Sequence, residues 1–321
     1  MRAAWGKRAG AAAVTVAMVP ALAGMGAGVA GAWGPGSAKN PPKGFKSERV
    51  NGAGMPDVLV RSWASTTTDP AKAPTVVLLD GLRATQDVSG WERDSNAAFL
   101  SEKGVNVVMP VGGTASFYTN WANTSRHGNG TYKATWGNFL ATSLPAYIKS
   151  RGFSDNLSLV GISMGGGAAL INAANNPGVY KRAAALSGFL NTSAPGMPVA
   201  VGVAMLDAGG YNVLDMWGGP LDANWAKNDP TVQAARLKGI PVWITASTGE
   251  PGKYTPNPSP ADIVQGVPLE ILAKSQSEAF KAAADKAGVK GHYDFSAVGT
   301  HTWGYWSDQV WQMQRTGWFN S

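Results

Sequence analysis

The chain has 321 residues, of which 44% are hydrophobic and 15% charged, which is enough for one large α/β domain. Its formal net charge is +7, but the basic residues are scattered, which argues against nucleic acid as a partner. Because the chain has no cysteine, no disulfide stabilises its fold. Most of its 13 tryptophans are expected in the core, and exposed ones would suit stacking on sugar rings or lining an acyl groove.

The first 32 residues have the organisation of a secretory signal peptide. Three basic residues within positions 2–8 precede an uncharged apolar stretch at 9–29, and residues 30–32 (AGA) provide a small-x-small cleavage pattern. An uncleaved membrane anchor is the alternative, although the glycine and proline residues in the stretch disfavour a spanning helix. We therefore expect residues 1–32 to be removed near Ala32 and the mature protein to be secreted or held in the cell envelope.

Residues 33–46 are rich in glycine and proline and predict an extended leader, whereas residues 47–321 predict a single domain. Short apolar runs bounded by turn residues predict buried strands of a mostly parallel sheet, at 57–63, 75–79, 105–110, 157–161, 183–186, 242–246 and 293–298. Helical patterns lie between and after these runs, at 139–150 (interrupted by Pro145), 165–174, 269–287 and 307–318. This alternation predicts a doubly wound α/β fold with helices on both faces of the sheet.

One long segment does not fit the alternation of strand and helix. Residues 191–231 contain the pairs Gly209-Gly210 and Gly218-Gly219 and predict a loop-rich insertion. In doubly wound folds, ligands bind outside the carboxyl ends of the strands. We therefore expect the insertion to lie over that edge of the sheet, above the functional site.

Ser163 occupies the centre of a complete G-x-S-x-G motif, Gly161-Ile162-Ser163-Met164-Gly165. The apolar run before it predicts a strand, and the small residues after it predict a helix. A strand, a sharp turn and a helix in this order form the nucleophile elbow of serine hydrolases. The glycines meet a steric need, because a strained turn with a serine at its tip leaves no room for neighbouring side chains. Ser163 is therefore the predicted nucleophile.

A serine nucleophile needs a histidine base oriented by a carboxylate, and in the hydrolase arrangement these follow in the order Ser, acid, His. The chain has three histidines. His127 precedes Ser163, so this order excludes it and it is expected in a surface loop. His292 opens the last predicted strand and is expected to be structural. His301 follows that strand directly, at its carboxyl end, and is therefore the predicted base.

The acid is less well defined by the residues alone. Glu250 is the carboxylate nearest to the end of the penultimate predicted strand, and topology narrowly favours it. Four other carboxylates between the serine and the histidine stay open, namely Asp262, Glu270, Glu278 and Asp285. The oxyanion hole needs two backbone N–H groups aimed at one point. We expect these from Met164, directly after the nucleophile, and from Leu82, in the glycine-containing turn after an earlier strand.

At this level of detail the chain resembles the antigen 85 family of mycolyltransferases, including its corynebacterial members that transfer corynomycolate to and from trehalose. Strings similar to the family's occur in family order over nearly the whole mature chain, at 78–84 (LLDGLRA), 108–113 (VMPVGG), 116–118 (SFY), 161–164 (GISM), 207–211 (DAGGY), 215–218 (DMWG), 228–231 (NDPT), 299–303 (GTHTW) and 305–306 (YW). Several such strings in one order make the resemblance highly specific.

The resemblance implies an α/β-hydrolase fold for residues 47–321 and an acyl-enzyme on Ser163. It implies transfer of a mycolic-type acyl group from trehalose monomycolate to a second trehalose monomycolate or another envelope acceptor. Glu270, in a Leu-Glu pair on a helix beyond the penultimate strand, matches the family's catalytic glutamate and displaces Glu250. The family's sugar-binding positions correspond here to four residues, Asp80, Arg83, Asn191 and Trp303.

Three classes of function follow from these residues. The first is an acyltransferase with Ser163, Glu270 and His301 as its triad. The second is a secreted carboxylesterase or lipase-like hydrolase on the same fold, in which water resolves the acyl-enzyme. The third is a non-catalytic envelope-binding paralogue, which is disfavoured because such proteins typically lose triad residues. No cofactor, metal or nucleic acid is expected in any of them, and the protein is expected to be a monomer.

Overall fold

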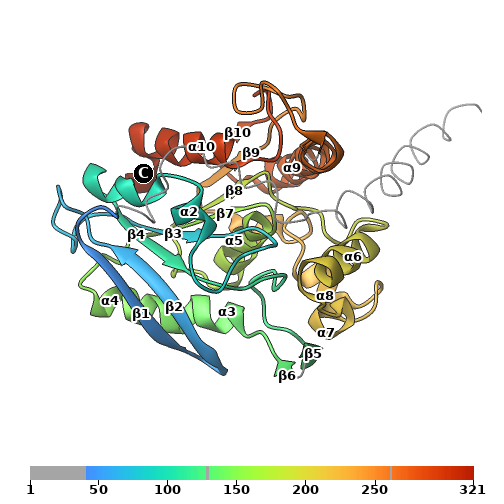
Figure 1. The fold of residues 1–321 in the computed structure, drawn as a ribbon, viewed down its shortest axis with the longest axis horizontal. Helices are drawn as coiled ribbons and strands as arrows, with labels where there is room; N and C mark the ends of the chain where they lie inside the picture. The colour runs from blue at the N-terminus through green and yellow to red at the C-terminus, as the bar shows by residue number, and fades with distance from the viewer. Residues whose placement is uncertain (1–40, 128–129, 261) are drawn as a thin grey trace, which may run out of the picture.

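The computed structural model describes residues 41–127, 130–260 and 262–321, so the predicted signal peptide, its cleavage site and most of the leader lie outside the described residues. An eight-stranded sheet with the order β1-β2-β4-β3-β7-β8-β9-β10 organises the chain (Figure 1). Its strands are β1 (Phe45–Gly52), β2 (Met55–Trp63), β3 (Thr75–Leu79), β4 (Asn106–Pro110), β7 (Leu157–Ile162), β8 (Arg182–Leu186), β9 (Val242–Thr245) and β10 (Gly291–Asp294). Strand β2 pairs antiparallel with both β1 and β4. All other pairs of the sheet, from β4 to β10, are parallel.

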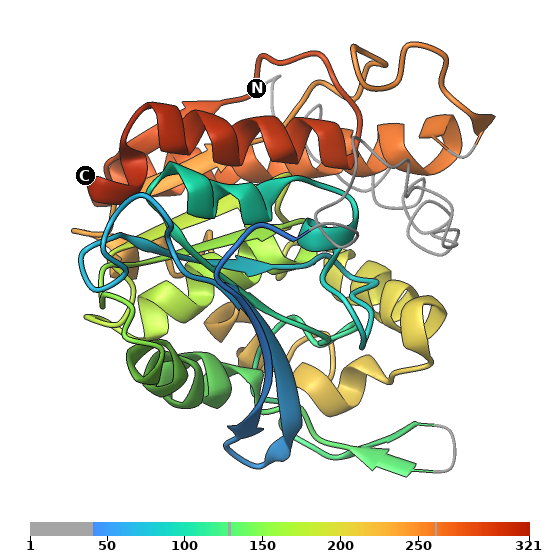
Figure 2. The same cartoon turned by 60° about the vertical axis from the view of Figure 1, so that its left-hand side comes forward.

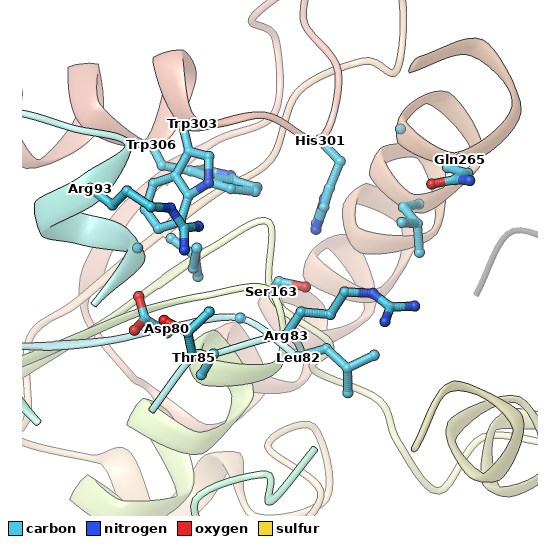
Figure 3. Close-up of a pocket in the computed structure, with 16 residues that line it drawn as sticks. Asp80, Leu82, Arg83, Thr85, Arg93, Ser163, Gln265, His301, Trp303 and Trp306 are labelled. Carbon is cyan, nitrogen blue, oxygen red and sulfur yellow. The ribbon is translucent and has the colours of Figure 1, made fainter. Parts of the chain in front are cut away.

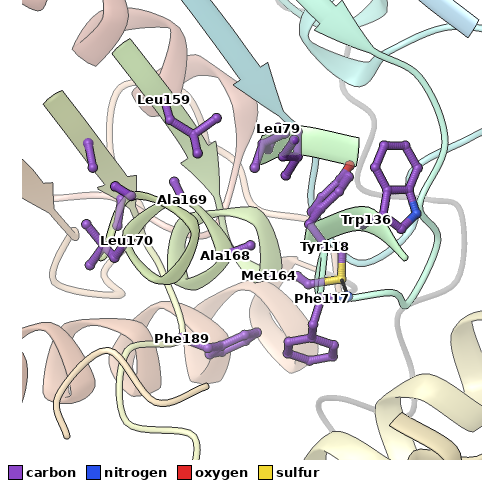
Figure 4. Close-up of a cluster of buried hydrophobic side chains, with 14 of the residues drawn as sticks. Leu79, Phe117, Tyr118, Trp136, Leu159, Met164, Ala168, Ala169, Leu170 and Phe189 are labelled. Atoms are coloured by element: carbon purple, nitrogen blue, oxygen red, sulfur yellow. Dashed lines mark hydrogen bonds between the residues drawn. The ribbon is translucent and has the colours of Figure 1, made fainter. Parts of the chain in front are cut away.

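The central strands are buried on both faces, which explains their continuous apolar sequence. Every residue of β3, β4, β7 and β8 is buried. Successive residues of β3 alternate between two core clusters, because neighbouring side chains of a strand point to opposite faces. Val77 and Leu79 join one cluster, shown in part in Figure 4, whereas Val76 and Leu78 join the other. The sheet is therefore covered by packed helices on both sides.

The first cluster packs against the helices α3 (Trp136–Asn138), α4 (Leu144–Ser150), α5 (Met164–Asn175) and α9 (Val267–Ala287), with the π-helical segment η2 (Phe139–Ser143) joining α3 to α4. The second packs against α2 (Gly90–Arg93), η1 (Ala97–Lys103), α10 (Trp303–Arg315) and the closing turn η5 (Trp318–Asn320). The predicted doubly wound α/β fold with helices on both faces is thus confirmed. None of the helices in the described part of the chain has the length and apolar composition needed to cross a membrane.

All seven predicted strands are present, most within one or two residues of their expected ends. The exception is the run at 293–298, because β10 already ends at Asp294. The carboxylate of Asp294 accepts hydrogen bonds from the backbone and hydroxyl of Ser296, which turns the chain out of the sheet. His301 therefore does not follow the strand directly but lies on a loop of residues 295–302.

Three strands, β1, β5 and β6, were not predicted. Strand β1 is mostly exposed and polar (FKSERVNG), so it lacks the apolar pattern of a buried strand, and it includes the last residues of the predicted leader. Strands β5 (Ser125–His127) and β6 (Gly130–Tyr132) form a separate hairpin that projects from the domain (Figure 2). The expectation of a surface loop for His127 was therefore wrong, since this residue ends β5.

The helix ends also differ from the sequence pattern. The last helix begins at Trp303 rather than at residue 307, and Gly317, with φ of +73°, follows its end. The helical stretch at 139–150 continues through Pro145, but it changes from the π-helical segment η2 to α4 at residue 144, directly before the proline.

The predicted loop-rich insertion at 191–231 is largely helical. It contains α6 (Met197–Gly209), α7 (Val213–Trp217) and α8 (Ala223–Lys227), and the short helices η3 (Ala234–Leu237) and η4 (Asp262–Gly266) follow later in the chain. Its glycines end helices instead of forming loops. Gly210 follows α6 in the left-handed conformation that glycine adopts easily at helix ends, and Gly218 follows α7 with φ of +81°, a positive value that also favours glycine.

Candidate active site

Ser163 lies at a sharp turn between β7 and α5, with φ of +51° and ψ of −120°. A positive φ at a non-glycine residue is strained, and its backbone N–H is held by a 3.0 Å hydrogen bond to the carbonyl of Leu186. The flanking glycines are required sterically. A Cβ at Gly161 would lie 2.0 Å from the carbonyl oxygen of Gly165, and one at Gly165 would lie 2.4 Å from that of Asp80. The predicted elbow is therefore present in full.

His301 lies on the loop after β10 and points toward Ser163 in Figure 3. Its Nδ1 is 2.8 Å from Oε2 of Glu270. Its Nε2 and the hydroxyl of Ser163 are both buried and have no hydrogen-bond partner. The ring is fixed by an edge-on contact with Trp306, at a centroid distance of 4.9 Å. One imidazole nitrogen is thus held by a carboxylate, while the other is free on the side of the serine.

Glu270 is completely buried in the first turn of α9, and both of its carboxylate oxygens have hydrogen-bond partners. Besides His301, it accepts a 2.8 Å hydrogen bond from the hydroxyl of Ser187 and one from the backbone N–H of Ser247. The indole N–H of Trp306 in turn donates to the Ser187 hydroxyl at 2.9 Å. These contacts fix the carboxylate at the end of β8 and β9, with one oxygen directed at the histidine.

The other candidate carboxylates do not contact His301. Glu250, which topology narrowly favoured, is exposed on the loop after β9, whereas Glu270, to which the family resemblance pointed, contacts the histidine. Asp262 caps its own turn by accepting from Ser259, Glu278 is exposed, and Asp285 pairs with Lys281. His292 stacks on Trp243 in β9 at 3.9 Å, as expected of a structural residue.

The two predicted oxyanion donors belong to the residue after the serine and to a turn that packs against it. Met164 is the first residue of α5, where a backbone N–H has no partner within the helix. Leu82 follows Gly81, whose position brings the turn after β3 so close that a Cβ there would lie 3.5 Å from the Cβ of Ser163. The N–H of Leu82 is not used in any backbone hydrogen bond of the described turns and loops. Both N–H groups are therefore available beside the serine hydroxyl.

Ser163 and His301 open into a cavity of about 410 Å³ (Figure 3). It brings together segments far apart in the sequence, and the residues that line it include Asp80, Leu82, Arg83, Thr85, Arg93, Ile162, Ser163, Gln265, Leu269, His301, Trp303 and Trp306. A cavity of this size takes a small molecule or part of a larger one. The described residues hold no group of three or more His, Asp or Glu that is placed to bind a metal ion.

Asp80 directly follows β3, lines this cavity and is nearly completely buried. Its Oδ1 accepts hydrogen bonds from the Ser89 hydroxyl at 3.0 Å and from the backbone N–H of Trp91 at 3.3 Å, whereas its Oδ2 has no partner. Burial raises the pKa of Asp80 to about 7, although the hydrogen bonds from Ser89 and the nearby backbone oppose this effect. The cavity thus contains a carboxylate with one unused oxygen.

The remaining predicted sugar-binding residues are placed differently. Trp303 lines the cavity and packs edge-on against Trp91 at 5.5 Å. Arg83 also lines it, but its guanidinium forms an ion pair with Asp207 on α6. Asn191 does not line the cavity, and its backbone N–H donates to Gln276 of α9 at 2.9 Å. The fold therefore brings Asp80, Arg83 and Trp303 to Ser163 and leaves Asn191 outside.

Four residues of the site were not singled out from the sequence. Ser187 and Trp306 support Glu270, and Arg93 and Gln265 line the cavity. Trp306 belongs to one of the strings similar to the family's, 305–306 (YW), so the sequence did contain a signal that could have pointed to it. The others lie in segments with no motif, and their positions depend on how the loops after β3, β8 and β9 fold together.

Comparisons with known proteins agree with this geometry. A family model described as "Putative esterase" matches residues 60–316. The chain is 36% identical over 318 residues to diacylglycerol acyltransferase/mycolyltransferase Ag85B of Mycobacterium intracellulare, covering 96% of this chain and 92% of that protein. It is 39% identical over 244 residues to diacylglycerol acyltransferase/mycolyltransferase Ag85C of Mycobacterium avium, covering 74% of this chain and 68% of that protein.

Two solved structures are also similar to this chain. MPT51 (FbpC1) of Mycobacterium tuberculosis superposes with a TM-score of 0.71 at 30% identity, covering 85% of this chain and 97% of that one. The serine hydrolase FphF of Staphylococcus aureus superposes with a TM-score of 0.64 at 14% identity, covering 86% of this chain and 98% of that one. At so low an identity, the second likeness shows a shared fold alone.

Proposed function

Since this chain belongs to the antigen 85 family of mycolyltransferases, within the wider esterase family, we propose that Ser163 carries the acyl group during transfer, with His301 as its base and Glu270 as the orienting carboxylate. The chain is an acyltransferase of the mycolyltransferase type. The observation that carries the residue assignment is the 2.8 Å contact between Glu270 and Nδ1 of His301, with Nε2 free on the side of Ser163.

In the first step, the Ser163 hydroxyl attacks the ester carbonyl of the donor lipid and its proton passes to Nε2 of His301. Glu270 stabilises the imidazolium that forms, because its Oε2 already accepts from Nδ1. The N–H groups of Leu82 and Met164 stabilise the negative oxygen of the tetrahedral intermediate. The intermediate collapses to the acyl-enzyme, and the leaving hydroxyl takes the proton from His301.

In the second step, an acceptor hydroxyl gives its proton to His301 and attacks the acyl-enzyme, which releases the acylated acceptor and restores Ser163. Water competes for this step, and only a bound and oriented hydroxyl outcompetes it, through its high effective concentration. Asp80, with one unpartnered oxygen, and the ring of Trp303 lie at one end of the cavity and would bind such an acceptor. This feature favours transfer over the simple esterase alternative.

We propose trehalose monomycolate as the donor and a second trehalose monomycolate or another envelope glycolipid as the acceptor. This assignment rests on the mycolyltransferase relatives and on the mixed polar and apolar lining of the cavity. We also propose that the protein is secreted to the cell envelope after removal of residues 1–32, on the basis of the signal-like amino-terminal sequence.

The test is to incubate the protein with trehalose monomycolate and identify the acylated products by mass spectrometry. We expect acylated trehalose products, a single fluorophosphonate label on Ser163, and a loss of roughly 10⁴-fold or more in turnover for Ser163→Ala. Free mycolic acid as the sole product would instead support the esterase. A label on another residue, or full activity in Ser163→Ala, would overturn the assignment of the nucleophile.

A further inference from the structure

Several buried polar atoms of the cavity lining have no hydrogen-bond partner among the described residues, namely Oδ2 of Asp80, Nε of Arg83, Oγ of Ser163, Oε1 of Gln265 and Nε2 of His301. The reaction uses the atoms of Ser163 and His301, and the proposed acceptor uses that of Asp80. A buried polar atom without a partner costs stability unless a ligand completes it. The unused donor of Arg83 and the unused acceptor of Gln265 therefore indicate a further polar contact with the substrate.

These two atoms belong to the side of the cavity away from the proposed acceptor. In Figure 3, Asp80 and Trp303 lie on one side of Ser163. Gln265 and the guanidinium of Arg83 lie on the other side. Because the four substituents of a tetrahedral intermediate diverge, an acyl group whose sugar oxygen faces Trp303 extends toward Gln265. The unfilled contact is therefore one with the acyl group.

The ion pair of Arg83 leaves its Nε unused. Nη2 donates to the carboxylate of Asp207 on α6, which holds the far edge of the guanidinium. Nε is nevertheless buried, and Arg83 directly follows Leu82, the proposed oxyanion donor. The Nε of Arg83 is thus an oriented donor on the residue next to the group that holds the carbonyl oxygen of the ester.

Gln265 places an amide among apolar residues of the cavity wall, since Leu82 and Leu269 line the same cavity. It belongs to η4, a π-helical turn, and such turns are frequent at functional sites. The carbonyl of the next residue, Gly266, accepts a 3.3 Å hydrogen bond from the backbone N–H of His301, which fixes the turn relative to the catalytic base. The amide is therefore held near the reacting atoms, although the fold makes no use of its oxygen.

A hydroxyl group completes both unused atoms, because it donates one hydrogen bond and accepts others. We propose that Gln265 determines which acyl groups the enzyme transfers: its Oε1 accepts from a hydroxyl on carbon 3 of the acyl chain, and Nε of Arg83 donates to the same hydroxyl. This inference rests on the proposed function, in which Ser163 carries a mycolic-type acyl group, since mycolic acids are 3-hydroxy fatty acids. Gln265 belongs to none of the strings similar to the family's, so the contact is a feature of this chain's own loop before α9.

The experiment compares the hydrolysis of two synthetic esters, p-nitrophenyl 3-hydroxyoctanoate and p-nitrophenyl octanoate. The measured quantity is the ratio of their kcat/KM values, which cancels any change that affects both esters alike. We expect Gln265→Leu to lower this ratio by roughly 3- to 10-fold, the value of one neutral hydrogen bond, through a slower reaction of the hydroxylated ester alone. Gln265→Glu should keep most of the ratio, because a carboxylate oxygen still accepts from the hydroxyl.

Gln314→Leu is the matched control. This glutamine lies on α10, donates to the backbone carbonyl of Lys103 at 3.3 Å and does not line the cavity, so its loss should leave the ratio unchanged. The proposal is overturned if a folded Gln265→Leu variant keeps the ratio of the unmodified protein, whether or not both esters react more slowly. It is also overturned if Gln265→Glu loses the ratio as fully as Gln265→Leu does. Failure of the proposed function is distinguishable, because it would appear as the absence of acylated trehalose products, whereas this ratio is measured by hydrolysis alone.

Discussion

Two buried carboxylates near Ser163 have opposite surroundings. Glu270 lies behind the wall of the cavity and accepts hydrogen bonds from Ser187 and Ser247, and its second oxygen contacts His301. Asp80 lies in the cavity itself, and one of its oxygens has no partner. A carboxylate whose hydrogen bonds are all made within the protein is suited to hold another side chain in one geometry. A carboxylate with an oxygen that lacks a hydrogen-bond partner is suited to bind a molecule that enters the cavity.

This difference predicts that substitutions of the two carboxylates fail in different ways. Glu270→Gln should lower acyl transfer and ester hydrolysis alike, by roughly 10⁴-fold, because the imidazolium of His301 loses its stabilising charge and its tautomer changes. The measurement is kcat for both reactions, together with a melting curve to show that the variant is folded.

Glu250→Gln is the control, because Glu250 is exposed and makes no contact with His301. It should retain nearly full activity in both reactions. A variant at Glu250 that is crippled, beside an active variant at Glu270, would reverse the assignment of the acid.

Much of the fold and part of the candidate site could be predicted from the sequence. Local sequence patterns predict the nucleophile motif, the histidine near the end of the last strand and most of the strands, and the structure contains all of these. Glu270 did not follow from such patterns. It lies far along the chain on α9, and its selection depends on how that helix packs against the ends of β8 and β9. Only the resemblance to a family pointed to it.

What the sequence missed has a common physical cause. Arg93 and Ser187 carry no local motif, and their positions in the site arise from loops that meet in space after β3 and β8. Asn191 was expected in the site from the family resemblance, but its backbone N–H donates to the side chain of Gln276. The glycine pairs of the insertion predict loops, whereas Gly209 is the last residue of α6 and Gly210 and Gly218 follow the ends of α6 and α7. Local patterns predict elements better than they predict which loops converge.

Asp80 should also make the free energy of unfolding depend on pH. The folded protein raises the pKa of Asp80 from 3.8 to about 7, so the folded state holds a proton that the unfolded state has already lost. This contribution to stability is fully present below pH 3.8 and is lost as the pH rises through about 7. Its upper limit is on the order of 4 kcal/mol.

Asp80→Asn removes this dependence, because the amide cannot ionise. The variant should therefore gain in stability relative to the unmodified protein between pH 5 and pH 8.5 (roughly the range of the titration), as measured by urea unfolding at both values. Other titrating groups are common to both proteins and cancel in the difference. Parallel stability curves for the two proteins would show that the pKa of Asp80 is not raised and that its free oxygen is hydrated.

The smallest expected effect concerns Trp306, which touches both sides of the comparison. Its indole N–H donates to Ser187 at 2.9 Å and so supports Glu270, while its ring also lines the cavity. Trp306→Phe keeps an aromatic ring against His301 but removes the N–H. If Trp306 acts mainly through Glu270, kcat should fall by about 2- to 10-fold for transfer and hydrolysis alike, the value of one neutral hydrogen bond. A change in the ratio of transfer to hydrolysis would instead assign Trp306 to the acceptor end with Asp80. The same assays with Ser187→Ala separate these outcomes, because Ser187 binds Glu270 and does not line the cavity at Ser163.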